Sequence, residues 1–288
     1  MSNLINPFAP FDAALASACQ TNVQAAMTED VGSGDLTGLL VPQDEMVQAR
    51  VIVREAAVLC GAPWFEAVMT TIDNRIRIDW QQAEGTLMTP DSVVCLITGP
   101  ARALLTAERG ALNFLQMLSG VATATRRYVD LIAGCSAQIL DTRKTLPGLR
   151  LAQKYAVRVG GGTNQRLALY DGILIKENHI AAAGGILPAM RAAQALNAGV
   201  TIQVEVENLA ELEQALAAGA VSILLDNFDL DMMRSAVTLN QGRAKLEASG
   251  GINFASVRAI AETGVDRISI GSLTKDIRAT DYSLRVLS

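Results

Sequence analysis

A regular alternation of strand-like and helical stretches, beginning near residue 137, constrains the fold of this sequence more than any other feature. Short β-branched or aliphatic runs lead into polar or glycine-rich turns and then into amphipathic helical patterns. This repeat of about 20 to 35 residues predicts parallel strands joined by crossover helices. The six strand-like runs are Ala137–Asp141, Gly172–Lys176, Val200–Glu207, Val221–Asp226, Lys245–Ser249 and Arg267–Gly271.

The number of these units limits the architecture. Six strand–helix units are fewer than the eight of a complete α/β barrel. We therefore expect an α/β fold with an incomplete barrel of six or seven strands over residues 116–274, and an open doubly wound sheet is the alternative. Helical stretches such as Leu209–Ala218 and Ser256–Thr263 lie between strands, and Gly219 and Gly264 are expected to end them.

The first 115 residues have a different pattern. The strand-like runs there are Gln48–Arg54, Arg75–Trp80 and Ser92–Thr98. The middle run alternates apolar with charged residues, and this period of two predicts a sheet with one solvated face. Helical patterns at Phe11–Met27 and Pro63–Thr70 would cover the other face. A further helix is expected over Ala101–Ala133, interrupted near Gly120, and we place the domain junction in this segment, with residues 1–115 as the N-terminal domain.

Composition and charge exclude several classes of protein. The chain has 288 residues, of which 50% are hydrophobic and 4% aromatic, as is ordinary for a globular α/β enzyme and wrong for a disordered chain. The net charge of −5 argues against a nucleic-acid partner, which would select a basic surface. No apolar run approaches the roughly 18 residues that cross a bilayer. The first basic residue is Arg50, so neither a signal nor a transit peptide is indicated, and we expect a cytoplasmic protein without a membrane partner.

The four cysteines give no sign of a metal or disulfide site. Cys19, Cys60, Cys95 and Cys135 are scattered, whereas zinc and redox motifs need close spacing and disulfide scaffolds need a higher density. We expect all four to be reduced thiols, mostly buried as small hydrophobic side chains.

Charged and glycine-rich residues recur where the six predicted strands end. In parallel α/β folds these carboxyl ends carry the reactive groups. The residues there are Asp141, Thr142, Arg143 and Lys144; Lys176; Glu205 and Glu207; Asp226; Ser249, Gly250 and Gly251; and Gly271 and Ser272. Between the first two strands, Gln165 and Arg166 follow the glycines at 160–162. A single strand-end aspartate is often a helix cap and a Lys–Arg pair is often solvated surface, so the recurrence on six successive strands carries the functional interpretation.

The chemistry of these strand ends suits two anions. Glycine and serine at the last two ends let backbone N–H groups approach a phosphate, which barrels commonly bind there. Four cations, Arg143, Lys144, Arg166 and Lys176, stand out in an acidic chain. Because the guanidinium fork matches a carboxylate, we expect a carboxylate-bearing compound beside a sugar phosphate. Glu205 and Asp226 are candidates for binding hydroxyl groups or a metal ion.

Several motifs resemble those of the quinolinate phosphoribosyltransferase family. They are EDVGSGDLT (Glu29–Thr37), ERGALNFLQMLSG (Glu108–Gly120), LDTRKTLPGLR (Leu140–Arg150), KYAVRVGGGTNQR (Lys154–Arg166), LYDGILIKENHI (Leu169–Ile180), VEVENL (Val204–Leu209), ILLDNF (Ile223–Phe228) and EASGGI (Glu247–Ile252). They stand in the family's order from about residue 22 to about residue 280, which makes the resemblance specific. It implies an N-terminal open-faced α/β sandwich, joined by the C-terminal segment 275–288, in front of the incomplete barrel.

The resemblance also implies a reaction and its residues. Quinolinate and phosphoribosyl pyrophosphate would give nicotinate mononucleotide, pyrophosphate and carbon dioxide, in NAD biosynthesis. Thr142, Arg143, Lys144, Arg166 and Lys176 would line the quinolinate pocket, with Arg109 reaching in from the neighbouring subunit of a homodimer. Glu205 and Asp226 would lie by the ribose hydroxyls and Mg²⁺, and Ser249, Gly250, Gly251, Ile270, Gly271 and Ser272 would hold the 5′-phosphate. Lys144, Lys176, Glu205 and Asp226 are the expected catalytic residues; whether dimers form a hexamer is left open.

One position departs from the family's pattern. Many members have histidine where this chain has Gln165, which can donate a hydrogen bond to a carboxylate but cannot become cationic. We expect the pocket to survive because Arg109, Arg143 and Arg166 remain. The lone histidine, His179, is expected to stabilise its loop. A nicotinate phosphoribosyltransferase-like enzyme and an inactive paralogue that acts as a binding module are the alternatives.

Overall fold

The computed structural model describes residues 11–287. Their contacts form two compact units. The first, called the sandwich unit here, comprises the chain up to Arg126, Thr145–Gly161 and the segment from Leu273 on. The second, called the barrel unit, comprises Arg127–Lys144 and Gly162–Ser272. Each is described by itself.

The barrel unit is built on a six-stranded parallel sheet. Its strands are β6 (Gln138–Leu140), β7 (Gly172–Ile175), β8 (Thr201–Val206), β9 (Ser222–Asp226), β10 (Lys245–Ser249) and β11 (Arg267–Ser269). Their order is β6-β11-β10-β9-β8-β7, so each strand from β7 to β11 lies beside the next in the chain and β11 returns to β6. A doubly wound sheet reverses direction at a switch point, and this one does not. The predicted incomplete barrel is confirmed, with its opening between β6 and β7.

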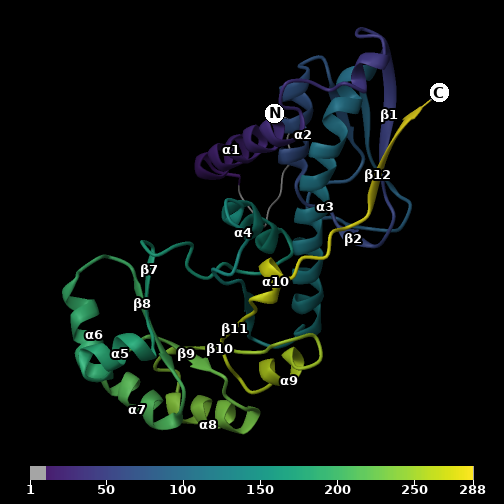
Figure 1. The fold of residues 1–288 in the computed structure, drawn as a ribbon. Helices are drawn as coiled ribbons and strands as arrows, with labels where there is room; N and C mark the ends of the chain where they lie inside the picture. The colour runs from purple at the N-terminus through teal and green to yellow at the C-terminus, as the bar shows by residue number, and fades with distance from the viewer. Residues whose placement is uncertain (1–10, 288) are drawn as a thin grey trace. The chain divides into compact units, whose positions relative to one another are not determined.

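Helices cover the outer face of this sheet (Figure 1). They are α5 (Glu177–Ala183), α6 (Ile186–Ala195), α7 (Leu209–Ala217), α8 (Leu230–Asn240) and α9 (Val257–Ala261). In α7 the side chain of Asn208 accepts a hydrogen bond from the N–H of Glu211, and Gly219 follows its end with a φ of 79°. Such caps fix where each helix begins and ends, and therefore where each strand-end loop lies.

The sandwich unit contains a four-stranded antiparallel sheet in the order β12-β1-β5-β3. Its strands are β1 (Met46–Val53), β3 (Arg77–Trp80), β5 (Val93–Pro100) and β12 (Tyr282–Leu287), and a separate pair joins β2 (Ala57–Val58) to β4 (Leu87–Met88). The helices are α1 (Ala13–Asp30), α2 (Ala62–Ile72) and α4 (Arg150–Val159), with a 3₁₀ turn at Gly38–Leu40. In α2, Phe65 is fully buried and packs edge-on against Trp80 of β3, with ring centroids 5.6 Å apart.

The predicted break near Gly120 is wrong, because α3 (Ala101–Leu131) runs through that residue without interruption. This glycine does not end the helix. It is needed because another segment of the chain packs closely against it. A Cβ at this position would collide with the backbone carbonyl of Arg278, which crosses the helix there. Two residues further on, the N–H of Thr280 donates to the carbonyl of Gln116 at 3.0 Å. The helix therefore accommodates the C-terminal segment that leads into β12.

Residues 145–161 belong to the sandwich unit, although they lie between β6 and β7 in sequence. The Tyr155 hydroxyl of α4 donates to Oε1 of Glu84 at 3.1 Å, and its ring lies 5.6 Å from that of Trp64. The side chain of Asn22 donates to the carbonyl of Gly148 at 3.1 Å. These long-range contacts attach residues 145–161 to the sandwich unit.

Two further properties agree with the sequence-based expectations. The four cysteines are free thiols, three of them buried and Cys135 half-buried. Within residues 11–287, no helix combines the length and apolar character that a bilayer crossing requires.

Candidate active site

An ion pair joins two neighbouring strand ends of the barrel unit. Lys176 follows β7, Glu205 lies near the end of β8, and Ile175 pairs with Val204 in the register between them. The Lys176 ammonium nitrogen is 2.8 Å from Oε2 and 3.1 Å from Oε1 of Glu205. The glutamate side chain is only 10% exposed, against 44% for the lysine. A carboxylate so removed from water needs a cationic partner, and Lys176 supplies it.

A second cation lies at the opposite edge of the sheet, where β6 and β11 pair. A Cβ on Gly271 would stand 3.0 Å from Cδ and 3.7 Å from Nζ of Lys144, so the lysine side chain lies directly over this glycine. The hydroxyl of Thr142 accepts the backbone N–H of Lys144 at 3.1 Å and is itself 3.7 Å from the same Cβ position. The loop after β6 therefore brings an ammonium group to a glycine turn of the kind that suits a phosphate.

Arg143 and Arg166 lie near one another in the barrel unit. The pKa of Arg166 is lowered by burial and then by the positive charge of Arg143, while the charges of Asp171 and Glu205 oppose that shift. Nη1 of Arg166 donates to the carbonyl of Gly172 at 2.9 Å. Two guanidinium groups held close enough to repel one another are stabilised by an anion between them. The arrangement therefore favours a carboxylate ligand.

Hydrogen bonds through Asn227 join the ends of β9 and β10. The side-chain amide of Asn227 donates to Oδ2 of half-buried Asp226 at 2.9 Å, and its backbone N–H donates to the carbonyl of Ser249 at 3.0 Å. Gly250 has a φ of 105°, and a Cβ there would collide with the Asn227 side chain. Gly251 also has a positive φ, of 58°. Only glycine fits position 250 without strain, which keeps the turn beside Asp226 narrow.

Polar side chains support these strand ends, among them Asn164 and Gln203, which the sequence did not single out. Asp141 is fully buried and accepts from the side-chain amide of Asn164 at 2.6 Å and from the N–H of Gln165 at 2.9 Å. The Gln165 side chain donates to Oε1 of Gln203 at 2.7 Å. A signal existed for Gln203, because it lies two residues before Glu205 on the same face of a largely apolar strand.

Not every predicted residue joins this set. Arg109 lies on α3 in the sandwich unit, with an exposed side chain. Glu207 lies beyond the end of β8 and is exposed, and its N–H donates to Oε2 of Glu211 at 2.8 Å. Because β8 ends at Val206, Glu207 does not extend the face of the strand that carries Glu205. Ile270 is buried, its N–H donating to the carbonyl of Leu140 at 2.9 Å, and Ser272 begins the short helix α10 (Ser272–Lys275).

His179 has a structural role. Its Nδ1 accepts the backbone N–H of Lys176 at 3.0 Å, and its own N–H donates to the Lys176 carbonyl at 2.8 Å. These two bonds cap the first turn of α5 and hold Lys176 at the strand end. The prediction that the histidine stabilises its loop is confirmed.

The carboxylates at the strand ends determine how the expected Mg²⁺ could bind. Among residues 11–287, no three His, Cys, Asp or Glu side chains are grouped so that they could hold a metal ion. Glu205 is already paired with Lys176, which leaves Asp226 half-buried at the next strand end. Mg²⁺ is usually bound through one or two carboxylates together with substrate phosphates. These residues therefore fit a magnesium ion that arrives with its substrate.

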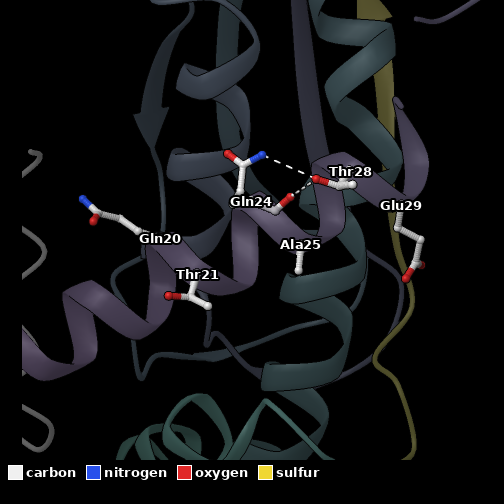
Figure 2. A pocket seen from close by; sticks show the side chains of 6 residues that line it. All are labelled: Gln20, Thr21, Gln24, Ala25, Thr28 and Glu29. Carbon is white, nitrogen blue, oxygen red and sulfur yellow. Dashed lines mark hydrogen bonds between the residues drawn. The ribbon is translucent and has the colours of Figure 1, made fainter. Parts of the chain in front are cut away.

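A hollow lies on the surface of α1 (Figure 2). It is lined by Gln20, Thr21, Gln24, Ala25, Thr28 and Glu29. The amide of Gln24 donates to the hydroxyl of Thr28 at 3.4 Å, and that hydroxyl donates to the Gln24 carbonyl at 2.9 Å. Glu29 is its one charged lining residue, and none of the predicted site residues lines it.

Cations, carboxylates and glycine turns lie at the carboxyl ends of the parallel strands, where barrel enzymes bind their substrates and commonly a phosphate. Comparison of the sequence with known families shows which family of such enzymes the chain belongs to. Residues 121–285 match the quinolinate phosphoribosyl transferase C-terminal domain, and residues 35–119 match the N-terminal domain. The chain belongs to the quinolinate phosphoribosyltransferase family, as its motifs predicted.

Individual relatives agree over nearly their whole length. The probable nicotinate-nucleotide pyrophosphorylase [carboxylating] of Bacillus subtilis is 42% identical over 259 residues, covering 90% of each chain. The nicotinate-nucleotide pyrophosphorylase [carboxylating] of Mycobacterium leprae is 39% identical over 277 residues, covering 93% of this chain and 96% of that one. The structure of the Francisella tularensis nicotinate-nucleotide pyrophosphorylase superposes with a TM-score of 0.92 at 45% identity, covering 94% and 97%.

Proposed function

We propose that this chain transfers a phosphoribosyl group to quinolinate with loss of carbon dioxide, giving nicotinate mononucleotide and pyrophosphate for NAD biosynthesis. The observation that carries the proposal is that the carboxyl ends of the parallel strands hold both the pair of Lys176 with Glu205 and Lys144 over Gly271. The lysines at these strand ends are then available to the phosphorylated sugar, and Arg143 and Arg166 to the dicarboxylate.

The pyridine dicarboxylate lies against the two arginines. Arg143 lies near enough to Arg166 to lower its pKa, and two neighbouring positive charges attract a doubly negative ligand more strongly than a monocarboxylate. Their planar guanidinium groups match carboxylates in two-point hydrogen bonds. Gln165 adds a neutral donor at the same place.

The phosphorylated sugar lies over the glycine turns. Backbone N–H groups at Gly250, Gly251, Gly271 and Ser272 can approach its 5′-phosphate closely. Glu205 and Asp226 hold the ribose hydroxyls and the magnesium ion bound by the pyrophosphate. That ion, when bound, neutralises negative charge on the pyrophosphate.

The chemistry needs cations more than a base. The pyridine nitrogen attacks the anomeric carbon with its own lone pair while the bond to pyrophosphate breaks, and Lys144 and Lys176 stabilise the departing negative charge. The adjacent ring carbon then loses its carboxylate as carbon dioxide. The electron pair left behind is stabilised by the cationic ring nitrogen and takes a proton from water. The arginines act by holding the reacting atoms in line.

Assembly and location complete the proposal. The enzyme is a homodimer in which Arg109 enters the partner's site, as the motif containing it implies for this family; its exposed side chain on α3 supports this. It works in the cytoplasm, and four free thiols without a disulfide support a reducing compartment.

The test follows the carboxylate that is lost. Quinolinate labelled in its 2-carboxylate is incubated with the protein, phosphoribosyl pyrophosphate and Mg²⁺, and released label is counted with and without the sugar substrate. We expect release that depends on phosphoribosyl pyrophosphate. Pyrophosphate formation from nicotinate without any release from quinolinate would identify a nicotinate enzyme, and no turnover of either would identify a binding module.

A further inference from the structure

The segment that follows the glycine turn of β10 is attached to helix α3 by an aromatic contact within the barrel unit. The ring of Phe254 stacks on that of Tyr128, with ring centroids 4.1 Å apart and an interplanar angle of 19°. The guanidinium carbon of Arg127 lies 4.3 Å from the centroid of the Phe254 ring. Tyr128 is only 4% exposed, so it provides a fixed surface for this contact. The turn is thus tied to a helix that lies far from it in sequence.

Arg258, on the helix α9, makes a second attachment to the same end of α3. Its Nη1 donates to the carbonyl of Ala133 at 2.9 Å and to that of Leu131 at 3.4 Å, and its Nε donates to Oε1 of Glu262 at 2.6 Å. Carbonyl groups at the end of a helix lack partners within it and carry partial negative charge, so a guanidinium group binds them favourably. Figure 1 shows α9 beside the C-terminal end of α3.

The short stretch between the turn and these attachments is held by its own hydrogen bonds. Oδ1 of Asn253 accepts the N–H groups of Ala255 at 2.9 Å and of Ser256 at 3.2 Å. The N–H of Asn253 in turn donates to the Ser256 hydroxyl at 3.1 Å. Because Phe254 follows Gly251 closely in sequence, a shift of the aromatic ring must displace the turn.

These contacts are poorly suited to a role in stability alone. Phe254 is half-buried, whereas Arg127 and Arg258 are exposed. Interactions of cations with aromatic rings and with carboxylates contribute little at exposed sites. A hydrogen bond from a backbone N–H to an anion, in contrast, weakens steeply when its angle departs from linear. Loss of these contacts should therefore disturb the turn more than it destabilises the fold.

We propose that Phe254 and Arg258 are positioning residues, which hold the turn Ser249–Gly251 in the place where it binds the 5′-phosphate of phosphoribosyl pyrophosphate. This inference rests on the proposed function, in which that turn lies against the phosphate. Neither side chain needs to touch the substrate, because both act through the backbone that follows the turn. The turn is fixed on its other side by Asn227, whose N–H donates to the carbonyl of Ser249 at 3.0 Å.

Two substitutions test this role. Phe254→Leu keeps an apolar side chain but removes the stacking, and Arg258→Met removes both bonds to the end of α3. Because part of a charge-assisted hydrogen bond to the phosphate is at stake, each should raise the KM for phosphoribosyl pyrophosphate by about threefold to tenfold. The KM for quinolinate, and kcat at saturating substrate, should stay unchanged. Phe254→Tyr keeps the aromatic face and should have the KM values of the wild type.

Arg243→Met is the matched control for Arg258→Met. Arg243 is exposed and also donates to carbonyl groups at the end of a helix, to Asn240 at 3.1 Å and to Leu239 at 2.7 Å in α8. It precedes the first residue of β10, so it lies at the opposite end of this strand from the turn. Its substitution removes the same kind of contact without reaching the turn, and its kinetic constants should equal those of the wild type.

Ribose 5-phosphate locates the effect, because it carries the 5′-phosphate but no pyrophosphate. Its dissociation constant, measured by calorimetry, should rise in Phe254→Leu and Arg258→Met by the same factor as the KM for phosphoribosyl pyrophosphate. If Phe254→Leu does not fold, Arg258→Met and its control decide the question, since the Arg258 side chain is exposed.

Unchanged constants in these variants, an equal rise of the KM for quinolinate, or the same effect in Arg243→Met would overturn the positioning role. A wild-type protein that binds ribose 5-phosphate but releases no carbon dioxide from quinolinate would instead refute the proposed function. The dissociation constant of ribose 5-phosphate would then still test how the turn is held, so the two failures are distinguishable.

Discussion

Both carboxylate oxygens of Glu205 lie within 3.1 Å of the Lys176 ammonium group, across two adjacent parallel strands. The pair can serve both substrates: the lysine is nearly half exposed and can bind an anion, whereas the glutamate is nearly buried. Removing the lysine leaves a carboxylate with little access to water and no cationic partner. This should be more damaging than leaving the lysine unpaired, because the lysine remains in contact with water.

We therefore expect Lys176→Met to lower kcat by about 100-fold or more and to destabilise the fold by about 1–3 kcal/mol. Steady-state kinetics and urea unfolding measure the two effects. Lys245→Met is the control, because Lys245 forms an ion pair with Asp266 at 2.6 Å with its own side chain 62% exposed. Exposed pairs contribute little, so the control should keep full activity and lose less than about 1 kcal/mol. Equal losses in both variants would contradict the assignment.

Lys144 and Gly271 give a second prediction. Lys144→Ala should lower turnover at saturating substrate by about 100-fold, because it removes a cation from the departing pyrophosphate. Gly271→Ala should displace the lysine side chain, since the added Cβ would lie 3.0 Å from its Cδ. The KM for phosphoribosyl pyrophosphate should then rise more than the KM for quinolinate. Full turnover by Lys144→Ala would refute its catalytic role.

The proposed sharing of the site between two subunits makes a prediction about mixtures of variants. Arg109→Ala and Lys176→Ala should each be nearly inactive alone. After subunit exchange, a mixed dimer would hold one site with both residues intact, so part of the activity should return. Exchange is verified with two differently tagged subunits. Proven exchange without any recovered activity would place Arg109 in the site of its own subunit or outside the site.

A buried glutamate makes stability depend on pH. Glu84 accepts from the N–H groups of Gly61 and Ala62 at 2.7 and 3.1 Å and from the Tyr155 hydroxyl, but burial outweighs these donors and raises its pKa to about 7. The native state therefore holds a proton that the unfolded chain releases near its ordinary pKa of 4.5. The free energy of unfolding must fall as pH rises between these values and level off above about 7.

Glu84→Gln removes this titration. Between about pH 5 and pH 8, the wild type should lose about 2 kcal/mol of unfolding free energy relative to the variant. Urea unfolding of both proteins at each pH measures the difference, in which the other titrating groups cancel. A difference that does not change with pH would mean that Glu84 has an ordinary pKa.

The barrel could be predicted from the sequence because its signals are local. Each strand is a short apolar run followed by turn residues. The six strand ends of the barrel carry the charged and glycine-rich residues that indicate the site. The helix break predicted at Gly120 was wrong because helix propensity describes only the local cost of glycine. Its actual reason, the passage of Arg278 across the helix, is a contact 158 residues away (278 − 120).

The support beneath the site was harder to predict for the same reason. Gln203 and Glu247 are 44 residues apart and meet only once β8, β9 and β10 are in register. Likewise, nothing in the sequence of α4 indicates that Tyr155 bonds to Glu84. Residues whose role depends on one distant partner are not readable from a single sequence.

The ratio of carbon dioxide to pyrophosphate tests the central claim most directly. The enzyme is given equal concentrations of quinolinate and nicotinate with phosphoribosyl pyrophosphate, and both products are quantified in the same reaction. A site built for a dicarboxylate should release one carbon dioxide for each pyrophosphate. Pyrophosphate in clear excess over carbon dioxide would show that the monocarboxylate is used, and would contradict the account.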